Sequence, residues 1–177
     1  MSNVFKMNED IDSMKASQDD IKWMEHTLRL ATDSMDPSTQ NAACILDASK
    51  QNLRGWAINA MTGKPSPERW ERPLKYQYVE HAERNAIYDA AGLGVALKDS
   101  VMYVPFSPCV ECARAIILSR VKCVITHSKI SEITPEHWKE SLKTASELLR
   151  ECGVEVLTME FPTYNVGIRF NGENIIL

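Results

Sequence analysis

The segments His81-Ala82-Glu83 and Pro108-Cys109-Val110-Glu111-Cys112 decide how this chain is organised. His81, Cys109 and Cys112 can supply three protein ligands to a zinc ion, which leaves a fourth tetrahedral position for water. Glu83 stands two residues after the histidine, where its carboxylate can exchange protons with a metal-bound water without displacing it. The pattern therefore predicts a catalytic zinc site that carries out hydrolysis.

The spacing of the two cysteines suits a single helix. Cys109 and Cys112 are three residues apart, so both sulfurs lie on one face in the first helical turn. A helix N-terminus also favours thiolates, and His81 opens the preceding predicted helix. A lone Cys-x-x-Cys also suits a redox pair or packing, but a structural zinc would need a fourth Cys or His ligand. The site is expected between two helix N-termini, beside the ends of the sheet strands.

Hydrophobic periodicity and turn residues around this stretch predict a mixed α/β domain. Helices between the last three strands imply parallel crossovers, and the first two strands form an antiparallel hairpin. The predicted architecture is a three-layer α/β/α fold with a mixed five-stranded sheet in which strands 3–5 are parallel. An Asn171-Gly172 turn adds a small C-terminal hairpin. Helices are expected at residues 17–35, 81–91, 108–119 and 135–151, and strands at residues 42–47, 53–58, 100–106, 122–126 and 154–160.

Composition limits the possible partners and the compartment. With 177 residues and 44% hydrophobic content, we expect a polar N-terminal tail over residues 1–17 and one domain over residues 18–177. The net charge of -4 favours a small molecule over extended nucleic acid. No apolar run suits a membrane span or a signal peptide, so a cytoplasmic location is expected. Three of the five cysteines are then reduced core thiols, namely Cys44, Cys123 and Cys152.

The order H-x-E followed by P-C-x-x-C is the signature of zinc-dependent nucleobase deaminases. The chain resembles the cytidine/deoxycytidylate deaminase superfamily, and most closely its deoxycytidylate branch. The resemblance implies a cytidine-deaminase-like fold, one zinc ion per subunit and a homo-oligomer such as a hexamer. The segments that carry it are DPSTQNAACIL at 36–46, KYQYVEHAERNAI at 75–87 and MYVPFSPCVECARAII at 102–117.

The resemblance also assigns roles to individual residues. His81, Cys109 and Cys112 would hold zinc, Glu83 would shuttle protons, and Asn59 would bind the sugar of the substrate. The segment around Asn59 lacks the glycines of the family's Gly-Tyr-Asn-Gly, which counts against regulation by dCTP and dTTP. Further substrate contacts are expected from Thr39, Asn41, Ala82 and Ser107, and from Ser38, Lys75, Tyr76 and His127.

For several of these side chains, the sequence also allows a role that involves no ligand. Basic residues in the loop over residues 59–76 together suggest an anionic substrate, although each alone suits a solvated loop. Tyr76 suits packing as well as stacking on a base, and His127 suits a surface position. Three interpretations stay open for Arg84 and Arg114: they form ion pairs in solvent, they support the zinc site, or they contact a second subunit. The basic residues of the loop are Lys64, Arg69, Arg72 and Lys75.

The predicted reaction is hydrolytic deamination of dCMP to dUMP and ammonia. Zinc hydroxide would attack the amino-bearing ring carbon, while Glu83 protonates the ring nitrogen and then the departing amine. Two alternatives stay open. One is a deaminase of another cytosine or purine base, nucleoside or modified nucleotide, and the acidic net charge counts against tRNA. The other is a zinc-stabilised binding module without catalysis.

Overall fold

The computed structural model describes residues 15–177, so the expected polar tail lies outside the described residues as far as residue 14. Ser17 begins the first helix, α1 (Gln18–Ala31), in a capping box with Asp20. The helix was predicted to extend to Met35 but ends at Ala31. It ends there because the side-chain amide of Gln40 bonds backbone carbonyl groups that follow the helix. Gln40 Nε2 donates to the carbonyl oxygens of Thr32 and Ser34 at 3.0 and 2.9 Å.

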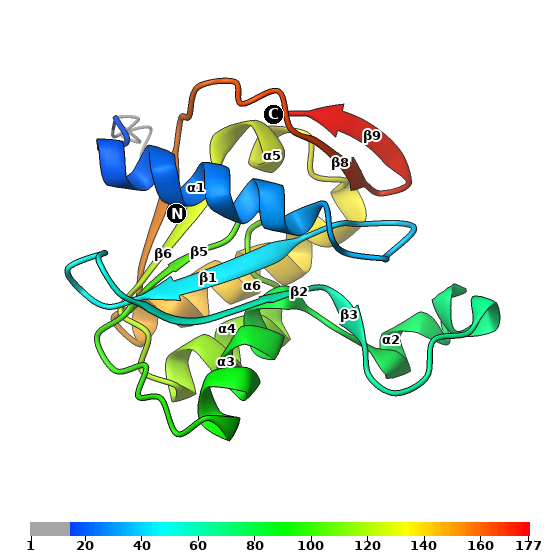
Figure 1. Cartoon of the computed structure of the whole chain (residues 1–177), viewed down its shortest axis with the longest axis horizontal. Coiled ribbons are helices and arrows are strands. Elements are labelled where there is room, and N and C mark those ends of the chain that lie inside the picture. The colour runs from blue at the N-terminus through cyan, green and yellow to red at the C-terminus, as the bar shows by residue number, and fades with distance from the viewer. Residues whose placement is uncertain (1–14) are drawn as a thin grey trace, which may run out of the picture.

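The central sheet has the predicted composition and directions. Its strand order is β2-β1-β5-β6-β7, with β1 antiparallel to both neighbours and β5, β6 and β7 parallel to one another. Figure 1 shows α1 crossing one face of this sheet and α3 and α4 lying on the other. The strands are β1 (Ala42–Leu46), β2 (Leu53–Ile58), β5 (Val101–Tyr103), β6 (Cys123–His127) and β7 (Glu155–Met159).

Apolar residues cover both faces of the sheet because side chains alternate along each strand. In β1, Ala43 and Ile45 pack in one cluster with α3 (Ala82–Gly92), α4 (Val110–Leu118) and α6 (Glu136–Glu151). Ala42 and Leu46 pack in the opposite cluster with α1. That second layer also includes α5 (Ser128–Glu132) and the hairpin of β8 (Gly167–Phe170) and β9 (Glu173–Ile176). The predicted three layers are therefore present.

Close packing fixes α3 against β2. A Cβ atom on Gly55 would lie 3.1 Å from the carbonyl oxygen of Ala86 and 3.3 Å from the Cβ of Ala90. A side chain at this position would therefore push the helix away from the sheet. Since His81 caps α3 and Glu83 lies in its first turn, this contact sets the position of both residues.

The segment predicted as a long loop, residues 59–76, contains regular structure. Strand β3 (Ala60–Met61) pairs with β4 (Val79–Glu80), and the 3-10 helix η1 (Pro67–Trp70) and α2 (Lys75–Tyr78) lie between them. This segment projects from one end of the molecule (Figure 1). The short helix α5 was also not predicted.

Two local predictions have different outcomes. The Asn171-Gly172 turn is confirmed, since both residues have positive φ, 50° and 86°, between β8 and β9. Cys44 and Cys123 are buried as predicted, but Cys152 is exposed, so its assignment as a core thiol is wrong. Cys152 caps the C-terminus of α6, directly before Gly153, and so lies outside the core. No helix among residues 15–177 is long and apolar enough to cross a membrane.

Candidate active site

Three predicted metal ligands meet at the start of two helices. His81 Nδ1 lies 3.6 Å from Cys109 Sγ and 3.5 Å from Cys112 Sγ. His81 caps α3, Cys109 caps α4, and Cys112 lies in the first turn of α4. Their ligand atoms lie within 4.8 Å of one another, and no other His, Cys, Asp or Glu side chains that the structure describes form such a group. Two sulfurs and one imidazole nitrogen in this arrangement fit a zinc ion with one open position.

The surroundings of Cys109 favour its thiolate form. The hydrogen bond with Cys112 and the neighbouring His81 together lower the pKa of Cys109 to about 3, against the effect of burial. The pKa of Cys112 is raised by the same hydrogen bond and by burial, so Cys109 is the first of the two cysteines to ionise. Thiolate is the form of cysteine that binds metals, so Cys109 is prepared to act as a ligand.

Glu83 lies beside the ligands and is buried. Its side chain has 2% relative exposure, and its Oε2 has no hydrogen-bond partner among the described residues. Burial raises the pKa of this carboxyl above its ordinary value, although the charge of His81 lowers it in part. A carboxyl with a raised pKa exchanges protons more readily near neutral pH.

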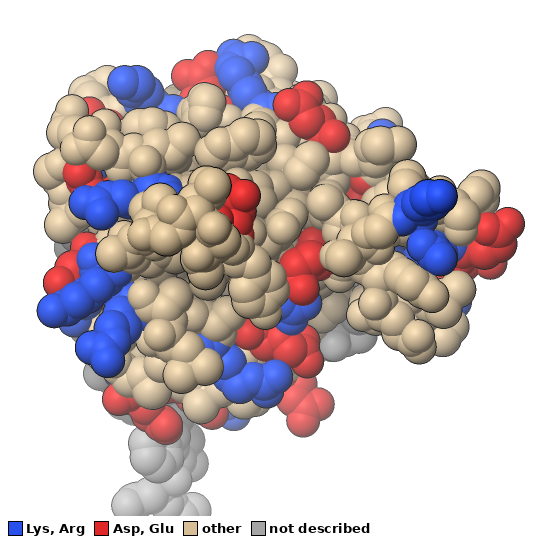
Figure 2. All heavy atoms as spheres, turned by 60° about the horizontal axis from the view of Figure 1, so that its bottom comes forward, with Lys and Arg blue, Asp and Glu red and all other residues tan. Residues whose placement is uncertain are grey.

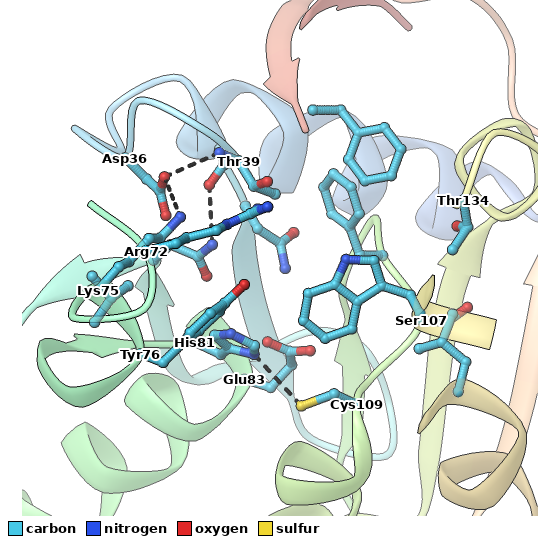
Figure 3. A pocket seen from close by; sticks show the side chains of 17 residues that line it. Asp36, Thr39, Arg72, Lys75, Tyr76, His81, Glu83, Ser107, Cys109 and Thr134 are labelled. Carbon is cyan, nitrogen blue, oxygen red and sulfur yellow. Dashed lines mark hydrogen bonds and ion pairs between the residues drawn. The ribbon is translucent and has the colours of Figure 1, made fainter. Parts of the chain in front are cut away.

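His81, Glu83 and Cys109 line one pocket, whose empty volume is about 810 Å³ with the open solvent at its mouth included. Figure 3 shows His81, Glu83 and Cys109 together at one end, and Arg72 and Lys75 near Asp36 on one side. Of the predicted substrate residues, those that line the pocket are Thr39, Asn41, Asn59, Lys75, Tyr76 and Ser107.

Asn59 connects the pocket wall to α3. Its Nδ2 donates to the carbonyl oxygen of Thr39 at 3.1 Å, and its Oδ1 accepts from the backbone N–H of Ala82 at 2.9 Å. Ala82 is fully buried and does not line the pocket, and its N–H is already bonded. The contacts of both residues with a substrate stay predictions.

Ser38 and His127 are not among the lining residues. The Ser38 hydroxyl accepts a hydrogen bond from Arg72 Nη2 at 3.2 Å, next to the pocket. His127 is 1% exposed, so the reading of a surface histidine is wrong. His127 is the last residue of β6, and α5 begins directly after it. The centroid of the Phe161 ring lies 5.3 Å from that of the His127 ring. Burial, together with the charge of Lys129, lowers the pKa of His127 to about 4.

Part of the pocket wall was not predicted from the sequence. The sequence placed Trp138 and Leu142 only within the helix expected at residues 135–151, and Phe170 only beside the predicted hairpin turn. Asp36 begins a segment that carries the family resemblance, but it had no role of its own. The repeated apolar spacing of α6 could have pointed to Trp138 and Leu142 once the helix was placed over the strand ends. The lining residues outside the predicted set are Asp36, Arg72, Val79, Phe106, Thr134, Trp138, Leu142 and Phe170.

Arg84 forms ion pairs beside the ligands. Its guanidinium bonds the carboxylate of Glu80, and its Nη1 lies 3.9 Å from Glu111 Oε2. Glu80 Oε1 also accepts from the backbone N–H of His81 at 3.2 Å. Arg84 thus links the histidine segment to the turn that carries both cysteines. Among the readings left open, these contacts favour support of the site.

Comparison with known proteins places this geometry in a family. The model of the cytidine and deoxycytidylate deaminase zinc-binding region matches residues 17–128. The deoxycytidylate deaminase of Mus musculus is 36% identical over 154 residues, which cover 80% of this chain and 82% of the relative. The deoxycytidylate deaminase of Homo sapiens is 36% identical over 125 residues, 64% of this chain and 68% of the relative.

A solved structure confirms the fold. The dCMP deaminase from the cyanophage S-TIM5, in complex with dCMP and dUMP, superposes with a TM-score of 0.59 at 20% identity. The match covers 78% of this chain and 94% of that one. The predicted cytidine-deaminase-like fold is confirmed, as is the prediction of a hydrolytic deaminase. The chain belongs to the cytidine and deoxycytidylate deaminase family.

Proposed function

We propose that this chain converts dCMP to dUMP and ammonia, with one zinc ion held by His81, Cys109 and Cys112. The observation that carries the proposal is the cluster of these three ligands beside the buried Glu83, in a pocket that His81, Glu83 and Cys109 line. Relatives named deoxycytidylate deaminases at 36% identity support the choice of substrate.

The chemistry divides between the metal and the chain. When bound, zinc acts as a Lewis acid that makes water a good nucleophile at neutral pH. Glu83 would take a proton from the attacking water, because its carboxylate is the buried acceptor next to the ligands, and would pass it to the ring nitrogen. The same carboxyl would then take the second proton, from the hydroxyl that the attack leaves on the ring carbon, and would pass it to the departing amine. Asn59 holds the start of α3 and thereby keeps Glu83 in place.

The rim of the pocket suits an anionic group. Lys75 is neutralised by Asp36 at 2.7 Å, whereas Arg72 donates to the uncharged hydroxyl of Ser38. Arg72 is therefore the better cation for a phosphate, since a guanidinium can present two parallel donors to phosphate oxygens. We assign the phosphate of dCMP to Arg72, with Ser38 beside it.

The face shown in Figure 2 supports a small substrate. Lys and Arg side chains are interspersed there with Asp and Glu, instead of forming one continuous basic area. A polyanion such as tRNA would need such an area. This arrangement favours recognition of a single nucleotide in the pocket.

The first experiment measures ammonia release from cytosine, cytidine, dCMP and dCTP by the zinc-loaded protein. We expect turnover of dCMP. Activity only on unphosphorylated compounds would contradict the assigned substrate, and inactivity on the whole panel would favour a binding module. Glu83→Gln should keep its zinc and lose on the order of 10²- to 10⁴-fold in turnover. The exposed Glu132, replaced by Gln, is the matched control.

The phosphate assignment has its own test. Arg72→Gln should lower kcat/KM for dCMP about tenfold and leave that for deoxycytidine unchanged. Arg69→Gln is the control, because Arg69 lies in the same segment and bonds the carbonyl oxygen of Lys64. Equal losses on both substrates would remove Arg72 from the phosphate site.

We also propose that the chain acts in the cytoplasm as a homo-oligomer. Support for association comes from large apolar side chains on the surface, since Met35, Leu93 and Leu118 are 73%, 72% and 82% exposed. Light scattering after gel filtration would measure the mass, and a monomer at micromolar concentration would contradict this part.

A further inference from the structure

We propose that Asn41 reads the substrate, and that its amide oxygen accepts a hydrogen bond from a hydroxyl or amino group of the bound molecule. The inference rests on the proposed function, because it concerns the same pocket. It adds a specificity-determining side chain to the zinc ligands and Glu83.

The starting observation is an unpartnered polar atom. Asn41 is 4% exposed, lines the pocket, and its Oδ1 has no hydrogen-bond partner within the described residues. Its backbone carbonyl is satisfied, since the oxygen accepts from the N–H of Asn59 at 3.0 Å. Buried polar side chains are normally bonded, so such an atom in a pocket indicates a missing partner.

Neighbouring amides make the contrast clear. Gln40 donates to two carbonyls and accepts from the N–H of Arg169 at 2.9 Å. Asn59 is bonded at both ends of its amide, and Asn85 Nδ2 donates to the carbonyl oxygen of Ile58 at 3.1 Å. Among these amides, Asn41 is the one whose oxygen is buried without a donor.

Three donors near the rim are directed to other groups of the chain. Asn59 Nδ2 donates to Thr39, Lys75 Nζ to Asp36, and Arg72 Nη2 to Ser38. A molecule that enters the pocket can supply the donor that Asn41 lacks. Since the free atom is an acceptor, that partner carries an O–H or N–H, which a sugar hydroxyl and an amino-bearing base both supply.

The position itself would suit an apolar residue. Asn41 directly precedes β1, whose five residues are all buried. A valine here would fill similar space without burying an unpaired oxygen, so the amide lowers stability unless a ligand bonds it. Residues that are unfavourable for stability at a pocket are typical of binding sites.

The test separates stability from binding. We expect Asn41→Val to melt at the same temperature as the parent or higher, with unchanged zinc content, and to raise the KM for dCMP about tenfold. A merely structural amide would lower the melting temperature and leave KM unchanged, and that result would overturn the proposal. Asn41→Ala serves the same comparison where valine is too large to fold.

Asn85→Val is the matched control. Asn85 is a partly buried asparagine whose amide is bonded within the chain, to the carbonyl of Ile58. Its replacement should lower the melting temperature and leave the KM for dCMP near that of the parent. A rise in KM equal to that of Asn41→Val would show that loss of any nearby amide has this effect, and would overturn the assignment.

A binding measurement distinguishes this inference from the proposed function. Calorimetry with dCMP is carried out on Glu83→Gln, with and without Asn41→Val. Absence of binding to the single variant would sink the proposed function, whereas equal binding to both would sink only the role of Asn41. Repeating it with 2′,3′-dideoxycytidine monophosphate identifies the donor. The difference between the variants should vanish if the sugar 3′-hydroxyl is the donor and persist if the base amine is.

Discussion

Lys75 Nζ lies 2.7 Å from Asp36 Oδ1, and both side chains are buried at the rim of the pocket, with 9% and 1% exposure. The same carboxylate oxygen accepts from the backbone N–H groups of Ser38 and Thr39 at 2.9 and 3.0 Å. One buried ion pair therefore holds α2 against the loop that leads into β1.

Replacement of Lys75 by Met should destabilise the protein by about 3–5 kcal/mol, because it leaves the Asp36 carboxylate buried without its counter-ion. Urea unfolding followed by circular dichroism measures the change. The double variant Lys75→Met, Asp36→Asn should recover part of the loss. Lys64→Met, at an exposed position in the same segment, is the control. A loss no larger than that of the control would contradict the structural role of the pair.

Phe170 brings the C-terminal hairpin into the pocket. The centroid of its ring lies 4.8 Å from that of the Phe106 ring. Two hydrogen bonds of 2.9 Å between Gln40 and Arg169 join β8 to the loop that leads into β1. Phe170→Ala should raise the KM for dCMP several-fold while kcat and zinc content stay near those of the parent, because an apolar wall is lost.

Steady-state kinetics and metal analysis provide the check for Phe170. Ile176→Ala is the control, since Ile176 lies on β9 of the same hairpin and is 61% exposed. An unchanged KM in Phe170→Ala would mean that the hairpin only covers the sheet.

Arg84 should strengthen zinc binding through its position between Glu80 and Glu111. Without these contacts, Glu80 is no longer held at the backbone N–H of His81, and the histidine is less well positioned, so Arg84→Gln should weaken zinc affinity about tenfold. Competition with a chromophoric chelator measures the affinity directly. Arg114→Gln, exposed on α4, should retain the parent affinity. Equal zinc affinities in the two variants would show that the ion pairs of Arg84 do not contribute to zinc binding.

The ionisation of Asp20 makes the stability of the folded protein depend on pH in acid. Burial would raise the pKa of this carboxyl, but bonds from Lys50, Ser17 and Tyr103 outweigh it and lower the pKa to about 2. Since the folded pKa lies below the unfolded one, the stabilisation is present above about pH 4 and is lost as the pH falls through about 2.

Asp20→Asn should therefore cost about 1–2 kcal/mol at pH 7, after allowance for solvent screening, and less near pH 2. Denaturant unfolding at both pH values tests this. Asp19→Asn, at an exposed position in the same helical turn, controls for helix charge. A difference between wild type and Asp20→Asn that stayed constant down to pH 2 would exclude this linkage.

Local patterns predicted the parts of the fold that depend on local chemistry. The Cys-x-x-Cys spacing and the helix start at His81 were sufficient to predict the ligand cluster, because each sits in the first turn of its own helix. Helical segments between strands were sufficient to predict the parallel strands β5, β6 and β7. The cysteine pair and the crossovers are local features, whereas His81 stands 28 residues before Cys109 and was joined to the pair through the H-x-E and P-C-x-x-C signature.

Features that depend on distant contacts were missed. Phe170 reaches the pocket through Arg169 and Gln40, which no local pattern connects. The end of β6 looked exposed, and only the unpredicted α5 explains why His127 is buried. The basic residues of the 59–76 segment suggested an anion site, but the pairing of Lys75 with Asp36 left Arg72 as the candidate.

The absence of a side chain at Gly55 has a consequence for how this enzyme can be altered. Because α3 rests directly on β2 there, a single added methyl group would tilt or lift the helix that begins at His81. The position of Glu83 relative to a bound nucleotide thus depends on how the same helix packs at Ala86 and Ala90, against a residue that does not line the pocket. Changes in substrate range or rate could then arise from the sheet beneath α3 while every pocket side chain stays the same.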